Sequence, residues 1–385
     1  MIAAQRRSLG FRLGVPLLLL VVSTTIALGL SEVALRILKP QVFPTIPAGL
    51  FTDGDDGFRV LTPGFTGTIS RAEFRAPVQI SDFGVRGPGP RPRKPNTFRM
   101  LMMGDSQTFG FGVLDDETYS VRLQEILAGM YRHADVQVVN AGVPGYGTVD
   151  EIFWLRKRGK EVDPDVIVVQ FLSVNDFKIN RYSPHARALL QEAGPDVAPD
   201  SVTEENQEEL SITVAARVVN AIHALKRKSH VLTLISESLS YAGMRAGLLG
   251  GVAAMWGEDF SPADAERTSR LIVLLAREAQ AMGVPIVLLY TTGKAQVIAG
   301  DGSPLPSALV MDNAAKQAGV PWIDMTAELR ARPDRQELYF VRDGHWTAAG
   351  HRAVAEVLAK RLPALGFVPR STTRDSASAV SRTHP

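Results

Sequence analysis

The stretch FRMLMMGDSQTFGFGV, residues 98–113, joins an apolar run to Gly-Asp-Ser and then to a segment broken up by glycines. Its first residues are almost continuously apolar, which is typical of a strand buried on both faces of a parallel sheet. The turn that follows carries Ser106, a residue type that suits a turn and also suits nucleophilic catalysis. The triplet alone leaves both interpretations open, because Asp followed by Ser is also an ordinary start of a helix.

Similar apolar runs follow this one, and helical stretches lie between them. The strands are expected at 98–104, 136–142, 165–172, 284–290 and 320–325. The helices are expected at 117–131, 149–160, 262–282, 305–318 and 347–363. Ser261 with Pro262 predicts the start of the third helix, and Gly283 predicts its end. Strands and helices that alternate with crossovers of this length predict a doubly wound three-layer α/β/α sandwich of about five parallel strands.

The N-terminus has the composition of a membrane segment. No charged residue lies between Arg12 and Glu32, and a helix of that length crosses most of a bilayer. Basic residues precede the segment, so we expect residues 1–12 in the cytoplasm, a transmembrane anchor at 13–35 and the rest outside, in a bacterial periplasm. A cleaved signal peptide and a buried core helix are the alternatives.

The remaining boundaries follow from composition. Residues 36–95 are rich in Gly and Pro and are expected to form a juxtamembrane spacer with short strands packed on the main domain, which covers 96–366. Residues 178–260 interrupt the alternation with an acidic stretch and a long amphipathic helical run, and predict a helical insertion. It either sets substrate choice or is a packing appendage. The small polar residues of 367–385 predict a disordered tail.

Candidate catalytic residues follow several of the predicted strands. In an open α/β sheet, functional groups gather beyond the carboxyl ends of the strands. Ser106 follows the first strand, Gly145 the second and Asn175 the third, and Asp343 and His345 come beyond the fifth. A serine nucleophile needs a base, here His345, and a carboxylate that orients the imidazole, here Asp343. The backbone N–H groups of Ser106 and Gly145 and the amide of Asn175 would form the oxyanion hole.

These residues resemble the sequence blocks of the SGNH or GDSL-type hydrolases over roughly residues 96–365, with the insertion unmatched. The matching blocks are Gly104-Asp105-Ser106, the glycine of NAGVPG, Asn175-Asp176, and Asp343 with His345. GDSQTFGFGV looks most like the membrane-anchored bacterial subgroup, related to polysaccharide O-acetyltransferase and esterase domains. The resemblance implies the flavodoxin-like SGNH hydrolase fold, a Ser-His-Asp triad and an oxyanion hole.

Two positions depart from the family pattern. Ser173 stands where the third block usually has glycine. One residue separates Asp343 from His345, as in the polysaccharide acetyltransferase relatives, whereas many members have two.

Several other polar residues have a structural interpretation. We expect Asp105 and Asp176 to fix the loops by hydrogen bonds, and Trp346 and His351 to be packing residues, with Trp346 alternatively lining the pocket. His223 and His230 lack a further ligand at metal spacing, so no metal is expected, and the glycines of GVPGYG do not form a dinucleotide fingerprint. We expect no cofactor.

Composition narrows the class of function. The 42 basic and 40 acidic residues nearly cancel, which argues against a nucleic-acid partner, and the absence of cysteine excludes thiol chemistry. We expect a membrane-anchored extracytoplasmic serine esterase that removes acyl groups, acetyl above all, from a carbohydrate or lipid-linked ester. The alternatives are an O-acetyltransferase of an envelope or secreted polysaccharide, a lipase or thioesterase, and an inactive polysaccharide-binding or assembly module.

Overall fold

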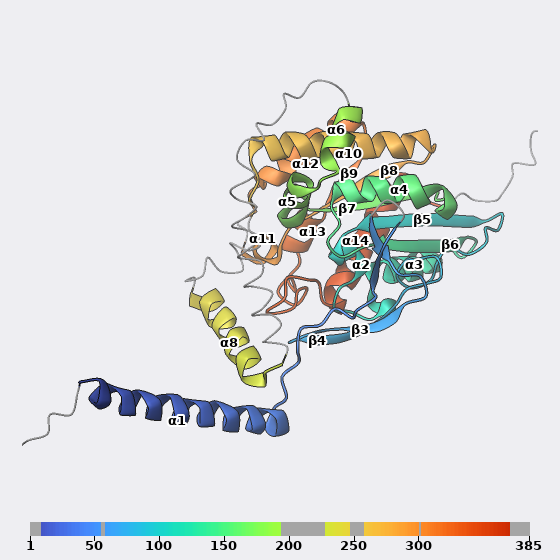
Figure 1. Cartoon of the computed structure of the whole chain (residues 1–385). Helices are drawn as coiled ribbons and strands as arrows, with labels where there is room; N and C mark the ends of the chain where they lie inside the picture. The colour runs from blue at the N-terminus through green and yellow to red at the C-terminus, as the bar shows by residue number, and fades with distance from the viewer. Residues whose placement is uncertain (1–8, 55–57, 194–227, 247–257, 300–301, 370–385) are drawn as a thin grey trace, which may run out of the picture. The chain divides into compact units, whose positions relative to one another are not determined.

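The computed structural model describes residues 9–54, 58–193, 228–246, 258–299 and 302–369 (Figure 1). The chain divides into two compact units. One consists of Met1–Pro44 with Ala198–Leu249, and the other of Thr45–Val197 with Gly250–Pro385. Each unit is described by itself.

In the first unit, α1 (Leu9–Leu38) and α8 (His230–Ala246) are the described helices. The segment Gly14–Leu38 of α1 is long and apolar enough to cross a membrane, and none of it is buried within the protein. The alternative of a core helix is therefore wrong. Of the long helical run expected in the insertion, α8 is the described part in this unit, and His223 and the predicted tail from residue 370 lie outside the described residues.

The second unit is built on a parallel sheet of five strands in the order β6-β5-β7-β8-β9. The strands are β5 (Thr97–Gly104), β6 (Asp135–Gly142), β7 (Val166–Leu172), β8 (Ile286–Thr291) and β9 (Trp322–Asp324). This is the flavodoxin-like order, in which chain direction across the sheet reverses between β5 and β7. β8 begins at Ile286, two residues later than expected, because Pro285 has no N–H for the ladder.

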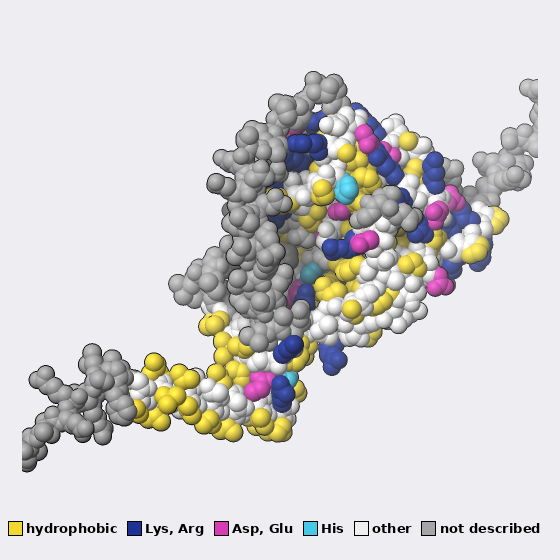
Figure 2. Space-filling model, in the orientation of Figure 1, with side chains coloured by type: hydrophobic (Ala, Val, Ile, Leu, Met, Phe, Trp, Pro, Cys, Tyr) yellow, Lys and Arg dark blue, Asp and Glu magenta, His cyan; other side chains and the backbone are white. Residues whose placement is uncertain are grey.

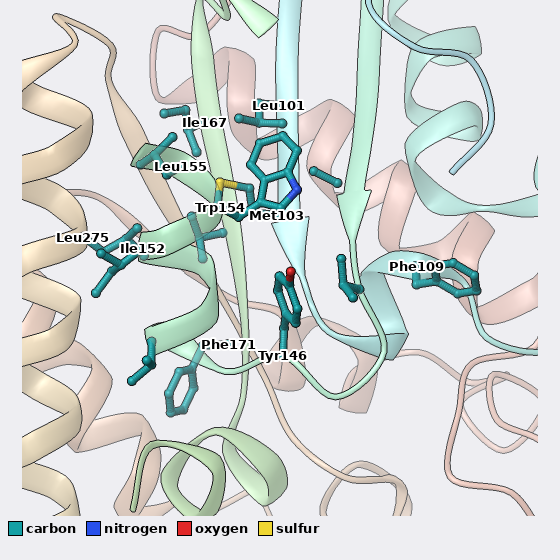
Figure 3. Close-up of a cluster of buried hydrophobic side chains, with 14 of the residues drawn as sticks. Leu101, Met103, Phe109, Tyr146, Ile152, Trp154, Leu155, Ile167, Phe171 and Leu275 are labelled. Carbon is teal, nitrogen blue, oxygen red and sulfur yellow. The ribbon is translucent and has the colours of Figure 1, made fainter. Parts of the chain in front are cut away.

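Helices cover both faces of this sheet. On one face lie α3 (Tyr119–Met130), α13 (Met325–Arg330) and α14 (Ala348–Ala364), and on the other α4 (Thr148–Val162), α10 (Pro262–Ala281) and α12 (Pro306–Ala318). Side chains of β5 alternate between the two cores: Met100 and Met102 pack with α3 and α14, whereas Leu101 and Met103 pack with α4 and α10 (Figure 3). The predicted three-layer α/β/α sandwich is confirmed.

The start of α10 shows how the sequence sets these boundaries. Ser261 Oγ accepts a hydrogen bond from the Asp264 backbone N, and Asp264 Oδ2 accepts one from the Ser261 backbone N. Pro262 occupies the first helical position, and Gly283, just past the end, has a φ of 72°. The predicted capping signals of this helix are confirmed.

The Gly- and Pro-rich segment 45–95 forms two antiparallel hairpins on this unit. The pairs are β1 (Phe51–Asp53) with β2 (Arg59–Leu61), and β3 (Thr66–Arg71) with β4 (Phe74–Gln79). Ile69, Val78 and Val85 are buried in the same core as Leu101 of β5. The Arg86 backbone N donates a hydrogen bond to the carbonyl of Asn140 in the edge strand β6, at 3.2 Å. This segment therefore shares the core of the sheet domain.

Candidate active site

The turn that carries Ser106 is tightly packed. Ser106 opens the short helix α2 (Ser106–Phe109), and the Asp105 side chain caps it by accepting from the Gln107 N at 2.8 Å. A Cβ on Gly104 would lie 2.2 Å from Thr108 Oγ1, and one on Gly142 would lie 2.2 Å from the Phe109 backbone N. Only glycine fits where the ends of β5 and β6 meet α2, and Ser106 stands at the carboxyl edge of the sheet.

Ser106, His345 and Asp343 lie in one chain of hydrogen bonds. His345 Nε2 is 2.8 Å from Ser106 Oγ, and His345 Nδ1 contacts Asp343 Oδ1. The His345 backbone N also donates to Asp343 Oδ1, at 3.0 Å. The Phe111 ring packs on the imidazole with centroids 4.7 Å apart. The structure thus brings together three of the residues that the sequence singled out.

Electrostatics select one tautomer of His345. Burial raises the pKa of Asp343, but the hydrogen bond and charge of His345 outweigh it, so the net pKa of Asp343 lies below its usual value. An ionised carboxylate only accepts hydrogen bonds, so Nδ1 carries the proton and donates to it. Nε2 then accepts from the Ser106 O–H. This is the arrangement in which an imidazole can take the proton of a serine as it attacks.

Gly145 and Asn175 follow β6 and β7, the two strands that flank β5. Asn175 lies in the first turn of α5 (Ser173–Tyr182), after β7, and its Nδ2 donates to Asp105 Oδ2 at 2.9 Å. One N–H of this amide is therefore tied to the residue before Ser106. Gly145 follows β6 with a φ of 88° and open space where a Cβ would stand. Its backbone conformation, and not crowding, favours glycine there.

The unusual Ser173 has a partner of its own. Its Oγ donates to Glu258 Oε1 at 3.1 Å, and the Ser307 backbone N donates to Glu258 Oε2 at 3.3 Å. Glu258 belongs to the end of the predicted insertion. The departure from the family glycine therefore comes with a contact that glycine would not make.

Contacts that the sequence did not predict hold the His345 loop. Gln107 Nε2 donates to the Gly344 carbonyl at 3.3 Å, and Gln107 Oε1 accepts from the Trp346 N at 3.1 Å. Gln107 therefore forms a hydrogen bond with each of the two residues next to His345. Glu73, in the turn between β3 and β4, accepts from the backbone N of residues 341, 342 and 343. Neither residue stands out in the sequence, because a glutamine after a serine and a glutamate in a turn are ordinary.

Arg86 fixes the segment that follows Ser106. Its side chain is 1% exposed, and its Nη atoms donate to the carbonyls of Phe109, Gly110 and Val113. Its Nε donates to Asp115 at 2.8 Å. Burial lowers the pKa of this guanidinium, and Asp115 opposes that shift. The segment after the nucleophile is thus anchored from the Gly- and Pro-rich region.

Asp105 and Asp176, the two acids next to the candidate catalytic residues, are buried and accept hydrogen bonds from backbone N–H groups. Asp105 caps α2, and Asp176 Oδ2 accepts from the Leu172 N at 2.8 Å, as the structural interpretation of both residues expected. Burial raises the pKa of both, and in Asp176 the charge of Asp105 adds to the effect.

Trp346 and His351 are packing residues. Trp346 is completely buried. His351 Nδ1 accepts from the Tyr119 N at 3.2 Å, and burial lowers the pKa of His351 to about 3, so the ring is neutral. Among the described residues, no group of three or more Asp, Glu or His side chains could hold a metal ion.

A groove of about 440 Å³ opens beside Gly145. It is lined by Phe58, Arg59, Pro144, Gly145, Tyr146, Asp150, Lys178, Ile179, Tyr182, Ser183, Pro184 and His185. Tyr182 is 66% exposed, and burial raises the pKa of Asp150 to about 6. Aromatic side chains and hydrogen-bonding groups therefore line this groove together with Gly145.

Comparison with known proteins agrees with this architecture. The family model of the GDSL-like lipases and acylhydrolases matches residues 102–310, more than half of the chain, and the model of the SGNH hydrolase-like domain of the acetyltransferase AlgX matches residues 257–384. No match was found among curated proteins.

Three of the similar solved structures are distant in sequence. A two-domain esterase active on acetylated mannans is 13% identical (TM-score 0.40), with 71% of this chain and 51% of that esterase covered, so this chain spans about half its length. A lipase/acylhydrolase from Enterococcus faecalis is 14% identical (0.37; 71% and 99% covered). An acetylxylan esterase from Geobacillus stearothermophilus is 15% identical (0.37; 71% and 97% covered). From the family model, the chain belongs to the GDSL-like lipase/acylhydrolase family and is an ester-acting hydrolase or acyltransferase.

Proposed function

We propose that the chain is a serine esterase that removes an acyl group, acetyl above all, from a carbohydrate ester. The observation that carries the proposal is the hydrogen-bonded chain from Asp343 through His345 to Ser106, with 2.8 Å between Nε2 and Oγ. Ser106 Oγ attacks the acyl carbonyl carbon while Nε2 takes its proton, and the sugar hydroxyl leaves with that proton. Water, deprotonated by Nε2, then releases the acid and restores the serine.

We propose the backbone N–H groups of Ser106 and Gly145 and the second N–H of the Asn175 amide as donors to the oxyanion. The bond from Asn175 to Asp105 supports this role, because it fixes the amide next to the nucleophile turn. Donors that are already oriented stabilise the developing charge without reorganisation.

The groove beside Gly145 supports a carbohydrate as the alcohol part of the ester. Sugars offer hydroxyl groups to side chains such as Lys178 and Asp150 and apolar ring faces to aromatic ones such as Tyr182. A long acyl chain would need an apolar, enclosed site instead. We therefore place the sugar in this groove and the acyl group at Ser106. A lipid-linked glycan offers the same chemistry.

A second candidate is transfer of the acetyl group to a sugar hydroxyl. The match to the SGNH-like acetyltransferase domain over residues 257–384 favours it. The acyl-enzyme is the same, and only the second nucleophile differs, so the two functions share every residue named above.

We further propose that α1 anchors the chain in a bacterial cytoplasmic membrane, with the catalytic unit on the periplasmic side. Support comes from the exposed apolar segment Gly14–Leu38 and from the three arginines that precede Leu13. A signal peptide has the same features, and N-terminal sequencing of the mature protein separates the two.

The test compares the full chain in detergent with Ser106→Ala and His345→Gln, using p-nitrophenyl acetate with and without short oligosaccharides. Loss of Ser106 should lower the rate by roughly 10⁴-fold. Nitrophenol release with unchanged sugars identifies an esterase, and acetylated sugars in the mass spectrum identify a transferase. A fluorophosphonate should label Ser106 and not the Ala variant. Equal inertness of wild type and variants would remove the catalytic proposal and leave a binding module.

The groove has its own test. Tyr182→Ala and Lys178→Ala should raise KM for an acetylated oligosaccharide and leave hydrolysis of p-nitrophenyl acetate unchanged. Lys360→Ala, an exposed lysine of α14, is the matched control. Unchanged KM for the oligosaccharide would show that the sugar binds elsewhere.

A further inference from the structure

A specific joint connects the insertion to the apolar helix α1. The Glu32 carboxylate accepts hydrogen bonds from Ser229 Oγ at 2.8 Å, the His230 backbone N at 2.9 Å and the Val231 backbone N at 3.0 Å. These donors lie at the start of α8, where unpaired backbone N–H groups and the helix dipole favour a negative charge. Glu32 therefore serves as a cap for a helix nearly 200 residues away in sequence.

Residues just after α1 strengthen the joint. The Gln41 backbone N donates to His230 Nδ1 at 2.8 Å, and the rings of Phe43 and His230 lie 4.7 Å apart. Arg36 donates to the Lys228 carbonyl at 3.3 Å. Contacts of three kinds thus fix the start of α8 at the C-terminal end of α1, and Figure 1 shows α8 turning away from the axis of α1.

The place of the joint along α1 matches the edge of a bilayer. The uncharged residues 13–31 span about 28 Å as a helix, close to the ~30 Å of a hydrocarbon core. Glu32 is the first charge after them and pairs with Arg36 at 3.0 Å. Exposed Lys39 follows at the end of α1, and exposed Lys228 precedes α8 by two residues. Figure 2 shows apolar side chains along α1 and charged ones gathered at its end. Basic residues at that level suit anionic lipid headgroups.

α8 presents an apolar face to its surroundings. Leu232, Ile235 and Leu239 are 37%, 46% and 63% exposed, and their spacing places them on one side of the helix. Ser238 and Ala242, exposed on the same side, are uncharged. A helix that begins at headgroup level with such a face has the features of one that lies in a membrane interface.

We propose that α8 lies in the outer headgroup region of the bilayer, with Leu232, Ile235 and Leu239 against the acyl chains. The insertion then gives the chain a second membrane contact besides its span. This inference depends on the proposed anchor, because the joint reaches headgroup level only if α1 crosses the membrane. The partner is a phospholipid surface with anionic headgroups.

The test uses the absence of cysteine from the sequence, which makes single labelling sites simple. The full chain carries one cysteine with the fluorophore NBD at Leu239, Ile235, Leu20 or Lys360 and is inserted into vesicles of phosphatidylcholine and phosphatidylglycerol. Leu20 reports on α1, and Lys360 reports on an exposed position of α14. We expect shallow doxyl-labelled lipid to quench Leu239 and Ile235, and iodide to quench Lys360 alone.

The outcomes separate the two proposals. If lipid quenches Leu20 while iodide quenches Leu239, the anchor stands and the α8 proposal is overturned. Protection of Leu239 from both quenchers also overturns it, since protein then covers this face. If lipid does not quench Leu20, the anchor itself fails. Glu32→Gln provides an independent check: it should reduce lipid quenching at Leu239 and leave Leu20 unchanged, and equal quenching at Leu239 would contradict the role of the joint.

Discussion

The loops that supply Ser106 and His345 are both anchored by side chains from residues 45–95, but in opposite ways. Arg86 is buried and donates to carbonyls of the segment after Ser106. Glu73 is half-buried and accepts from backbone N–H groups of a loop whose Val341 is 60% exposed. A carbonyl that loses its donor in the interior stays unpaired, whereas an N–H at the surface finds water. Burial of the anchored groups should therefore decide how much each anchor matters.

The largest effect should come from Arg86→Met. The variant removes the side-chain donor to three carbonyls and the ion-pair partner of Asp115, so we expect the free energy of unfolding to fall by about 3–5 kcal/mol. Urea unfolding followed by tryptophan fluorescence measures it. Arg75→Met, at an exposed position of β4, should stay within about 0.5 kcal/mol of wild type. If the two variants are equally stable, the comparison between buried and exposed anchors fails.

Asp343→Asn tests whether the Asp343 carboxylate orients His345 for catalysis. An asparagine amide can donate to Nδ1, which leaves the imidazole proton on Nε2, where it cannot accept from Ser106. We expect kcat for p-nitrophenyl acetate to fall roughly 10²–10³-fold with little change in KM. The exposed Asp116→Asn is the control. A wild-type rate in Asp343→Asn would exclude Asp343 as the orienting carboxylate.

Asp150, which follows β6, is an anchor of intermediate burial, between the buried Arg86 and the exposed loop that Glu73 holds. Asp150 is half-buried, accepts from the Gly147 N at 2.9 Å and has its pKa raised by burial from 3.8 to about 6. The folded state thus holds this proton more tightly than the unfolded state, and stability falls as pH rises from about 4 to 6. Asp150→Asn should be more stable than wild type by about 3 kcal/mol above pH 6 and equal to it below pH 4. Thermal unfolding across pH measures this, and a constant difference would contradict it.

Gln107→Leu tests the contact that joins the two loops. It removes the bonds to Gly344 and Trp346, so His345 loses its exact place beside Ser106. We expect kcat to fall about 10-fold while KM stays the same, because positioning affects the chemical step and not ground-state binding. The pH profile of kcat should keep its shape. A rise of KM alone would show that Gln107 acts on substrate binding.

The sequence predicted the sheet, its flanking helices and the capping of α10, because buried parallel strands are apolar throughout and caps have local signatures. It also placed Ser106 and Asn175 directly after strands, whose ends topology brings to one edge, and His345 beyond the fifth strand. Arg86 and Glu73 could not be found in this way. Each forms hydrogen bonds with backbone atoms that are distant in sequence. An arginine in a glycine-rich segment has no sequence pattern that distinguishes a buried anchor from a surface residue.

Glu73→Gln should have the smallest effect and so marks the lower end of the comparison. Glutamine keeps one acceptor oxygen, so the variant loses either the bond from the Val341 N to Oε1 or the bonds from the Arg342 and Asp343 N to Oε2. Val341 and Arg342 are exposed, so water can replace the lost partner there. We expect a loss of at most about 1 kcal/mol in unfolding free energy, which should shrink with added salt. Lys294, which donates to the carbonyls of Phe340 and Val341, keeps the loop in place in the variant. A loss as large as that of Arg86→Met would show that charge, and not burial, decides how strongly these anchors hold the site.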